Sequence, residues 1–239
     1  MKKHFLILAM IVSVMLLACS PKDEDENNNS NGDNDNNIIT GTINGHDWID
    51  LGLPSGLKWA TCNIGANKPE EYGDYFAWAE ISPKESYTEY NYQHWADANG
   101  NGYWDVGELT VNIDISGTQY DAATNNWGES WRMPTIDEMQ ELIDHCRWVR
   151  TQVNNIRGVK VIGPNGGSIF LPAASFRYGS SLYDAGSYGN YWSSTPYYDY
   201  YGISANRIIF SIDDSSGSDF EYLDALDRFL GHTVRPISE

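Results

Sequence analysis

The sequence predicts an α+β domain built from short antiparallel strands and one clear helix over about residues 135–148. Short apolar stretches separated by Gly, Pro and Asp recur along the chain, which is typical of strands joined by tight turns. A strong helix-start signal follows Pro134. Residues 38–239 are long enough to bury one sizeable core, so we expect a single folded domain there.

The first 18 residues read as a secretory signal peptide. Lys2 and Lys3 give a basic start, and residues 5–17 are apolar except for Ser13. This apolar run is too short for a membrane-spanning helix, which needs about 20 residues. The segment is therefore expected to direct export and to be removed.

The residues Leu16-Leu17-Ala18-Cys19 resemble the bacterial lipobox, in which the cysteine is acylated and becomes the first residue of the mature protein. The resemblance implies palmitate-type acylation with several chains on Cys19, and a durable membrane anchor, because a single acyl chain binds only marginally. The alternative is an ordinary signal peptide with a chance cysteine. We expect an outer-membrane lipoprotein.

Residues 19–37 are expected to form an acidic, asparagine-rich tether. Lys22 followed by acidic residues 23–26 resembles the surface-export signal of Bacteroidota lipoproteins, and a solvated acidic linker is the alternative. Residues 27–37 are nearly all Asn, Asp, Ser and Gly and cannot bury enough apolar surface to fold. The predicted location of the domain is the cell exterior.

The formal net charge of the full chain is −18, and loss of Lys2 and Lys3 with the signal peptide makes it −20. A chain this acidic is repelled by nucleic acid and by anionic lipid surfaces. Nucleic-acid partners are therefore not expected, whereas cations and neutral ligands such as glycans remain open.

Residues 41–59 alternate apolar side chains with Gly, Pro and Asp and predict short strands. The predicted helix begins with a capping box, in which Thr135 is the N-cap and Glu138 lies three residues later. Met139, Leu142 and Cys146 then lie on one apolar stripe, so the helix should reach about Trp148. Later strands are expected over residues 159–162, 168–171, 191–194, 206–212 and 233–237, and that over 206–212 should be half-buried.

Cys62 and Cys146 are the cysteines that follow Cys19. An exported chain meets an oxidising compartment, where two cysteines tend to pair. We therefore expect a Cys62–Cys146 disulfide, with two buried thiols as the alternative.

Residues 97–108 match the twelve-residue EF-hand loop, with side-chain oxygens at positions 1, 3, 5, 9 and 12, a backbone carbonyl at 7 and glycine at 6. Asn at positions 3 and 5 lowers the charge, and the flanks do not predict strong helices. A polar surface loop is the alternative to a structural calcium site. The expected calcium ligands are Asp97, Asn99, Asn101, Tyr103, Asp105 and Glu108.

Stretches 48–63, 121–128, 131–135, 191–194 and 234–237, taken in this order, resemble the FISUMP (Fibrobacter succinogenes major paralogous) domain of Bacteroidota lipoproteins. The resemblance implies a C-type-lectin-like fold whose first and last strands pair, and no established enzyme activity. The calcium and sugar motifs of C-type lectins are absent: Trp192 is followed by Ser193-Ser194. Their calcium-dependent sugar binding is therefore not implied.

Residues 183–201 are rich in tyrosine among Gly, Ser and Asp. Tyrosine offers a rigid face and a hydroxyl at low entropic cost, as ligand-binding loops favour. Tyr191 and Trp192 are expected to be core strand residues. The residues expected to be exposed for ligand binding are Tyr197, Tyr198, Tyr200 and Tyr201.

Catalytic motifs are weak in this sequence. Ser55 and Lys58 match Ser-x-x-Lys but lie in a Pro-Gly turn without a following helix, and the histidines lack metalloprotease spacing. The expected function is a non-enzymatic binding or adhesion module for a glycan or a protein. A surface glycan hydrolase and a structural component of a cell-surface assembly are the alternatives.

Overall fold

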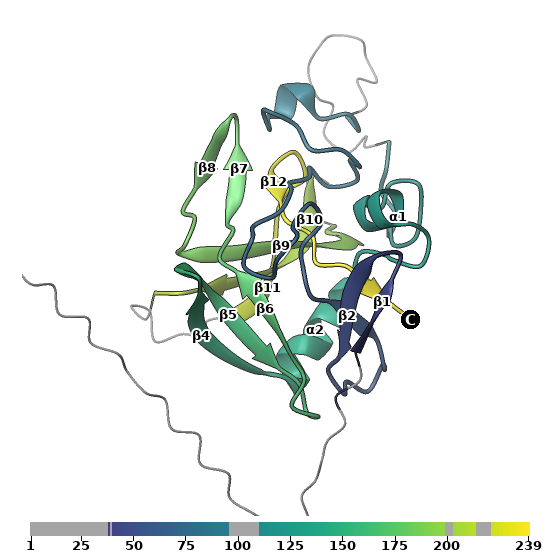
Figure 1. Cartoon of the computed structure of the whole chain (residues 1–239). Coiled ribbons are helices and arrows are strands. Elements are labelled where there is room, and N and C mark those ends of the chain that lie inside the picture. The colour runs from purple at the N-terminus through teal and green to yellow at the C-terminus, as the bar shows by residue number, and fades with distance from the viewer. Residues whose placement is uncertain (1–37, 39, 96–109, 199–202, 214–220) are drawn as a thin grey trace, which may run out of the picture. The chain divides into compact units, whose positions relative to one another are not determined.

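A computed structural model describes residues 38, 40–95, 110–198, 203–213 and 221–239 (Figure 1). The chain divides into two units, Met1–Asp35 and Asn36–Glu239, and every described residue belongs to the second. None of the helices in the described ranges is long and apolar enough to span a membrane.

The predicted α+β, C-type-lectin-like class is wrong, because the protein is mostly β. Strands make up 40% and helices 11%, and the described residues form four antiparallel sheets with one helix of seven or more residues. The helix-start signal at Thr135 is strong but local, and it says nothing about how many strands surround the helix.

The strands are joined mainly by short turns. In the β1–β2 hairpin, Asn44 and Gly45 both have positive φ, 51° and 84°, and in the β4–β5 hairpin Asn154 and Asn155 have φ of 48° and 66°. Two-residue hairpin loops need this backbone, and Asn and Gly adopt it at the lowest cost. The strands are β1 Thr40–Ile43, β2 His46–Asp50, β3 Lys58–Ala60, β4 Arg147–Val153, β5 Ile156–Ile162, β6 Ser168–Pro172, β7 Phe176–Tyr178, β8 Ser181–Tyr183, β9 Tyr188–Pro196, β10 Ser204–Ser211, β11 Glu221–Asp227, β12 Gly231–His232 and β13 Ile237–Ser238. The helices are η1 Glu89–Asn91, α1 Ala122–Trp127 and α2 Ile136–His145.

The first sheet has the order β1-β2-β3-β13, so the end of the chain returns beside its first strands. The family resemblance implies that the first and last strands pair, but β13 pairs with β3 and not with β1. The strand expected over 233–237 is replaced by two short strands, β12 and β13, with the residues between them extended along other segments. There the amide of Ile237 donates to Arg132 and the amide of Trp192 donates to Thr233.

Helix α2 starts as predicted and ends earlier. The Thr135 hydroxyl accepts from the Glu138 N–H, and the Glu138 carboxylate accepts from the Thr135 N–H and, in a two-point ion pair, from Arg132. The helix ends at His145 because β4 begins at Arg147. The indole N–H of Trp148 then donates to the Leu142 carbonyl, 3.2 Å away, and satisfies the end of the helix from the following strand.

The sheet of β9, β10 and β11 lies at the centre and is covered on both faces. Ile208 and Phe210 point into one core cluster, with Met139 and Leu142 of α2 and the inner face of β5 and β6. Trp192 and Ala205 point into a second cluster, with the indoles of Trp78, Trp127 and Trp131. The half-buried strand predicted over 206–212 is therefore buried on both sides.

Candidate functional site

Tyr197 follows directly on β9, where the chain leaves the central sheet. Its N–H donates to the carbonyl oxygen of Ser204 at 3.1 Å. The side-chain amide of Asn206 donates to the carbonyl oxygens of Thr195 and Pro196, 3.3 and 2.9 Å away. The backbone that carries Tyr197 is thus held by the neighbouring strand.

The pairing of β9 with β10 is irregular just before Tyr197. Beyond the Pro196–Ala205 pair, residues 193–195 of β9 face Asn206 alone. Such a bulge bends the strand, leaves backbone groups without ladder partners and turns the side chains that follow. The amide of Asn206 supplies the missing donors, so the bulge is stable and the direction of Tyr197 is set by it.

A cleft of about 470 Å³ opens beside Tyr197, next to the N-terminal end of α2. Small-molecule sites usually have volumes of about 300–1,000 Å³ and combine an apolar lining with a few polar groups. This cleft has that composition. Its apolar lining residues are Ile136, Leu223 and Ala225, and its polar ones are Tyr197, Ser204, Asn206 and Asp224.

The Tyr197 ring is 45% exposed, and its hydroxyl has no hydrogen-bond partner among the described residues. Tyr198 is 71% exposed. By contrast, the adjoining strand buries Tyr191 and Trp192 completely, as the sequence predicted. Tyr197 is therefore free to offer both its ring face and its hydroxyl to a ligand.

Asp224 borders the cleft through strand β11, but its side chain points to the opposite face of the sheet, because Asp224 pairs with Arg207 while Asn206 pairs with Ala225. Its Oδ2 accepts from the Arg207 guanidinium at 2.8 Å, and Arg207 also donates to the Asn190 side chain. The polar side chains that face the cleft are therefore the uncharged ones of Tyr197, Ser204 and Asn206.

The structure brings one of the four predicted ligand residues, Tyr197, to the cleft. Tyr198 is exposed beside it, and Tyr200 and Tyr201 lie outside the described residues. The other lining residues were not predicted as site residues. They come from α2, β10 and β11, and nothing in the sequence indicates that these segments meet.

The lipidation residue Cys19 and the predicted calcium ligands over 97–108 also lie outside the described residues. The residues that border the predicted calcium loop are joined: the N–H of Thr110 donates to the carbonyl of His94 at 3.1 Å. Elsewhere in the described ranges, no three His, Cys, Asp or Glu side chains are grouped to hold a metal.

The expected Cys62–Cys146 disulfide is not formed, and both cysteines are free in the structure. Cys146 caps α2 and packs against the first core cluster, where burial raises the pKa of its thiol to about 11. Cys62 follows β3 and lines a small cavity with His46. The two thiols therefore lie in different environments: that of Cys146 faces the core from the end of α2, and that of Cys62 lines the small cavity.

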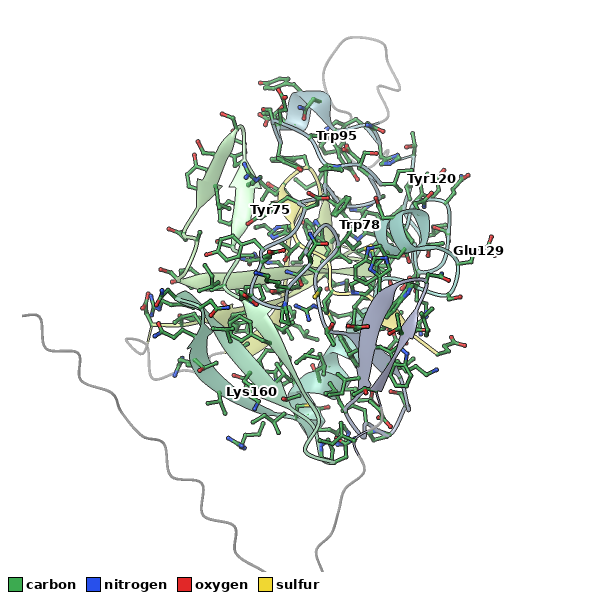
Figure 2. All side chains as sticks on the ribbon, viewed as in Figure 1. Tyr75, Trp78, Trp95, Tyr120, Glu129 and Lys160 are labelled. Atoms are coloured by element: carbon green, nitrogen blue, oxygen red, sulfur yellow. The ribbon has the colours of Figure 1, made fainter. Side chains whose placement is uncertain are left out.

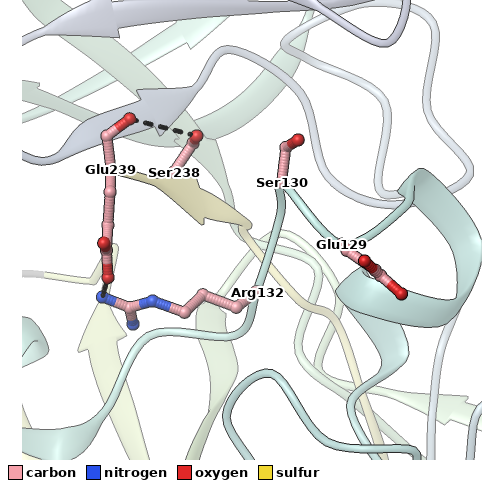
Figure 3. A pocket seen from close by; sticks show the side chains of 5 residues that line it. All are labelled: Glu129, Ser130, Arg132, Ser238 and Glu239. Carbon is pink, nitrogen blue, oxygen red and sulfur yellow. Dashed lines mark hydrogen bonds and ion pairs between the residues drawn. The ribbon is translucent and has the colours of Figure 1, made fainter.

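Two other cavities are less suited to a ligand because their charged groups satisfy one another. In the cavity of Figure 3, of about 350 Å³, Arg132 faces Glu239, but its guanidinium is already held by Glu138. In a cavity of about 440 Å³ beside His94, Glu80 is ion-paired to Lys84 at 2.8 Å. These side chains are committed to structural contacts.

Ser55 and Lys58, which match Ser-x-x-Lys, are also used structurally. The N–H and hydroxyl of Ser55 both donate to the Glu141 carboxylate, at 2.8 and 2.6 Å, and tie the Pro-Gly turn to α2. Lys58 donates to the Glu239 carbonyl and lies over the Trp48 ring. The serine and lysine side chains thus hold different parts of the fold together.

Comparison with known proteins adds no further assignment: no protein-family model, curated protein or solved structure matches this chain.

Proposed function

We propose that this chain is a cell-surface lipoprotein whose folded domain binds a glycan in the cleft beside Tyr197. The observation that carries the proposal is the exposed Tyr197 ring at the edge of a cleft that also contains the side chains of Ser204 and Asn206. A sugar ring has apolar C–H faces and a rim of hydroxyls. An aromatic face stacks on the former, and amide or carboxylate groups hydrogen-bond the latter.

The charge of the site favours a neutral glycan. The side chains that face the cleft are uncharged, and the Asp224 carboxylate on the other face of β11 is paired with Arg207. The whole chain has a formal charge of −18. Uronic acids and sulfated sugars would be repelled by this charge, whereas a neutral, hydroxyl-rich sugar would not.

Export, anchoring and calcium binding belong to the same proposal and rest on the sequence. Cys19 would carry the lipid, residues 20–37 would serve as the tether, and residues 97–108 would hold a structural calcium ion. A family relationship to FISUMP lipoproteins is in keeping with this arrangement.

A hydrolase and a protein-binding module are the competing functions. Glycosidases use two carboxylates about 5–9.5 Å apart. The described side chains that face the cleft include none, because the Asp224 carboxylate is ion-paired on the opposite face of the sheet. A protein partner would use a larger surface around Tyr197 and Tyr198 in place of a single sugar ring.

A glycan array with the purified mature chain tests the proposal. We expect binding to neutral oligosaccharides that disappears in Tyr197→Ala and persists in Tyr183→Ala, which removes an exposed tyrosine of the β7–β8 hairpin. An array without any bound glycan would contradict the proposal and favour a protein partner. Polysaccharide turnover that is abolished by a single carboxylate substitution would establish the hydrolase instead.

A further inference from the structure

A second cavity, of about 370 Å³, lies on the face of the β4–β5–β6 sheet that points away from the core. It shares no lining residue with the Tyr197 cleft. It is more apolar than the other cavities described above. Its lining residues are Thr61, Pro69, Glu70, Thr151, Val153, Lys160, Ser168, Ile169 and Phe170.

The floor of this cavity is the ring of Phe170. A Cβ added at Gly158 of the neighbouring strand would lie 2.6 Å from Cζ of Phe170, so the ring rests directly on the glycine. The ring therefore lies close against the sheet, Phe170 is 8% exposed, and the cavity lies over the outer face of the ring. Val153 and Pro69 extend the apolar surface to the sides.

Arg235, which is fully buried, holds the walls of the cavity in place through hydrogen bonds to their backbone. Its guanidinium donates to the carbonyl of Thr61 at 2.7 Å and to the carbonyl of Phe170 at 2.9 Å. Its Nε donates to Asn63 Oδ1 at 2.8 Å. The loop that carries one wall is thus joined to the strand that carries the floor, so a ligand has little to order when it binds.

Lys160 provides the cation of the cavity (Figure 2). Within the described residues its ammonium makes no ion pair and no hydrogen bond, whereas Lys84, Arg132 and Arg207 each pair with a carboxylate. An unpaired cation beside apolar surface favours an anionic group on a ligand.

The second charged group, Glu70, lies at the other end of the cavity. Its carboxylate accepts from the side chain of Asn154, at 2.7 Å, in the β4–β5 turn. Lys160 pairs with Val149, and the turn begins after Val153, four residues further along β4. At about 3.3 Å per residue the two ends are roughly 13 Å apart. A ligand with acidic groups at both ends would be repelled by Glu70.

We infer that this cavity binds a small amphipathic monoanion, with an apolar ring or short chain against Phe170 and its acidic group against Lys160. This ligand class differs from the neutral glycan proposed for the Tyr197 cleft. The inference therefore stands or falls independently of that site.

Two fluorescent probes that differ in one charge test the inference on the mature chain. Anilinonaphthalene sulfonate is an amphipathic monoanion, and N-phenylnaphthylamine is its uncharged analogue. We expect the sulfonate to bind saturably with one probe per chain. In Lys160→Met its Kd should rise by about two- to fivefold, the effect of losing one exposed charge pair, while the affinity for the neutral probe stays the same.

Three further variants complete the design. Thr151→Trp fills the cavity from an exposed β4 position and should weaken both probes at least tenfold; Ser168→Phe fills it from β6 if the first variant melts early. Arg147→Met removes an exposed cation of the same sheet that does not line the cavity, and should leave both affinities unchanged. Tyr197→Ala should also leave both unchanged.

Sulfonate binding that is indifferent to Lys160→Met, or probe binding that survives both filling variants, would overturn the inference. Absence of saturable binding by the wild-type chain would overturn it as well.

Discussion

The side-chain amide of Asn206 donates a hydrogen bond to the carbonyl oxygen of Pro196, 2.9 Å away. Pro196 is the last residue of β9 and immediately precedes Tyr197. Asn206 of β10 thus holds the end of β9 in place, and the exposed ring of Tyr197 projects from the residue that follows. The proposed glycan site depends on this support, because a ring that stacks on a sugar must be held in a defined orientation.

Asn206→Ala removes two hydrogen bonds to the bulged strand and should lower the free energy of unfolding by about 1–2 kcal/mol. It should also weaken glycan binding severalfold, because Tyr197 is then less well ordered. Asn126→Ala is the matched control: its amide also donates to two backbone carbonyls, of Ile81 and Ala122, away from the cleft. Urea denaturation and calorimetric titration measure both effects. Equal loss of affinity in the two variants would contradict a positioning role for Asn206.

Asp121 is completely buried, and its carboxylate accepts four backbone N–H groups. Oδ1 accepts from Ala123 and Thr124 at 2.7 and 3.1 Å, and Oδ2 accepts from Gly117 and Met133, both at 2.8 Å. Asp121→Ala leaves two buried donors, of Ala123 and Met133, and two part-buried ones unsatisfied, and should cost about 3–5 kcal/mol in chemical denaturation. Asp121→Asn keeps an acceptor on one side and should cost less. A loss below about 1 kcal/mol for the alanine variant would contradict this role.

The buried imidazole of His232 should lower the free energy of unfolding in mild acid. Its imidazole is fully buried beside Trp192 with no hydrogen-bond partner for either nitrogen, and burial, with Arg207 nearby, lowers its pKa well below the usual value. The unfolded chain titrates near pH 6.5, so below that pH it binds more protons than the folded state. The free energy of unfolding should therefore decrease as pH falls below about 6.5, by up to about 1.4 kcal/mol per pH unit for this group.

Chemical denaturation between pH 8 and pH 5 measures this slope. His232→Phe should reduce it. His46 and His94, whose pKa values are also lowered by burial, should keep part of the slope in the His232 variant. A slope that is identical in wild type and His232→Phe would show that His232 does not contribute.

Local signals in the sequence predicted local structure well. The capping box places the start of α2 correctly, because Thr135 and Glu138 satisfy each other's backbone groups without help from the rest of the fold. The apolar runs predict β5 and β6 to within a few residues, since both strands point apolar side chains into the core. These elements follow from residues that are neighbours in the chain.

The class of the fold and the lining of the cleft could not be predicted in the same way. β4 was missed because Cys146 extends the apolar stripe of the helix, and β11 because its residues are only partly buried. Asn206 and Ala225 reach Tyr197 only through the pairing of β10 with β9 and β11. These strands are separate segments of the chain, and no pattern in the sequence predicts that they pair.

Calcium should stabilise the chain if residues 97–108 form the proposed site. An ion that binds only the folded state raises the free energy of unfolding by about 2.7 kcal/mol at a hundredfold excess over Kd. Extracellular loops of this kind bind in the range of roughly 0.1–1 mM. Millimolar calcium should therefore raise the Tm of metal-stripped protein by several degrees, and Glu108→Gln should abolish the shift. A Tm that is indifferent to calcium up to about 10 mM would leave only a polar loop.

Calorimetric titration of the best array glycan into wild type, Tyr197→Ala, Tyr197→Phe and Tyr183→Ala tests the central claim most directly. The loss of the stacked ring in Tyr197→Ala should raise Kd about tenfold or more, which corresponds to about 1.4 kcal/mol. Tyr197→Phe, which keeps the ring and loses the hydroxyl, should have an intermediate Kd, and Tyr183→Ala should bind as wild type. A wild-type Kd in Tyr197→Ala, with the melting curve unchanged, would contradict a glycan site at this tyrosine.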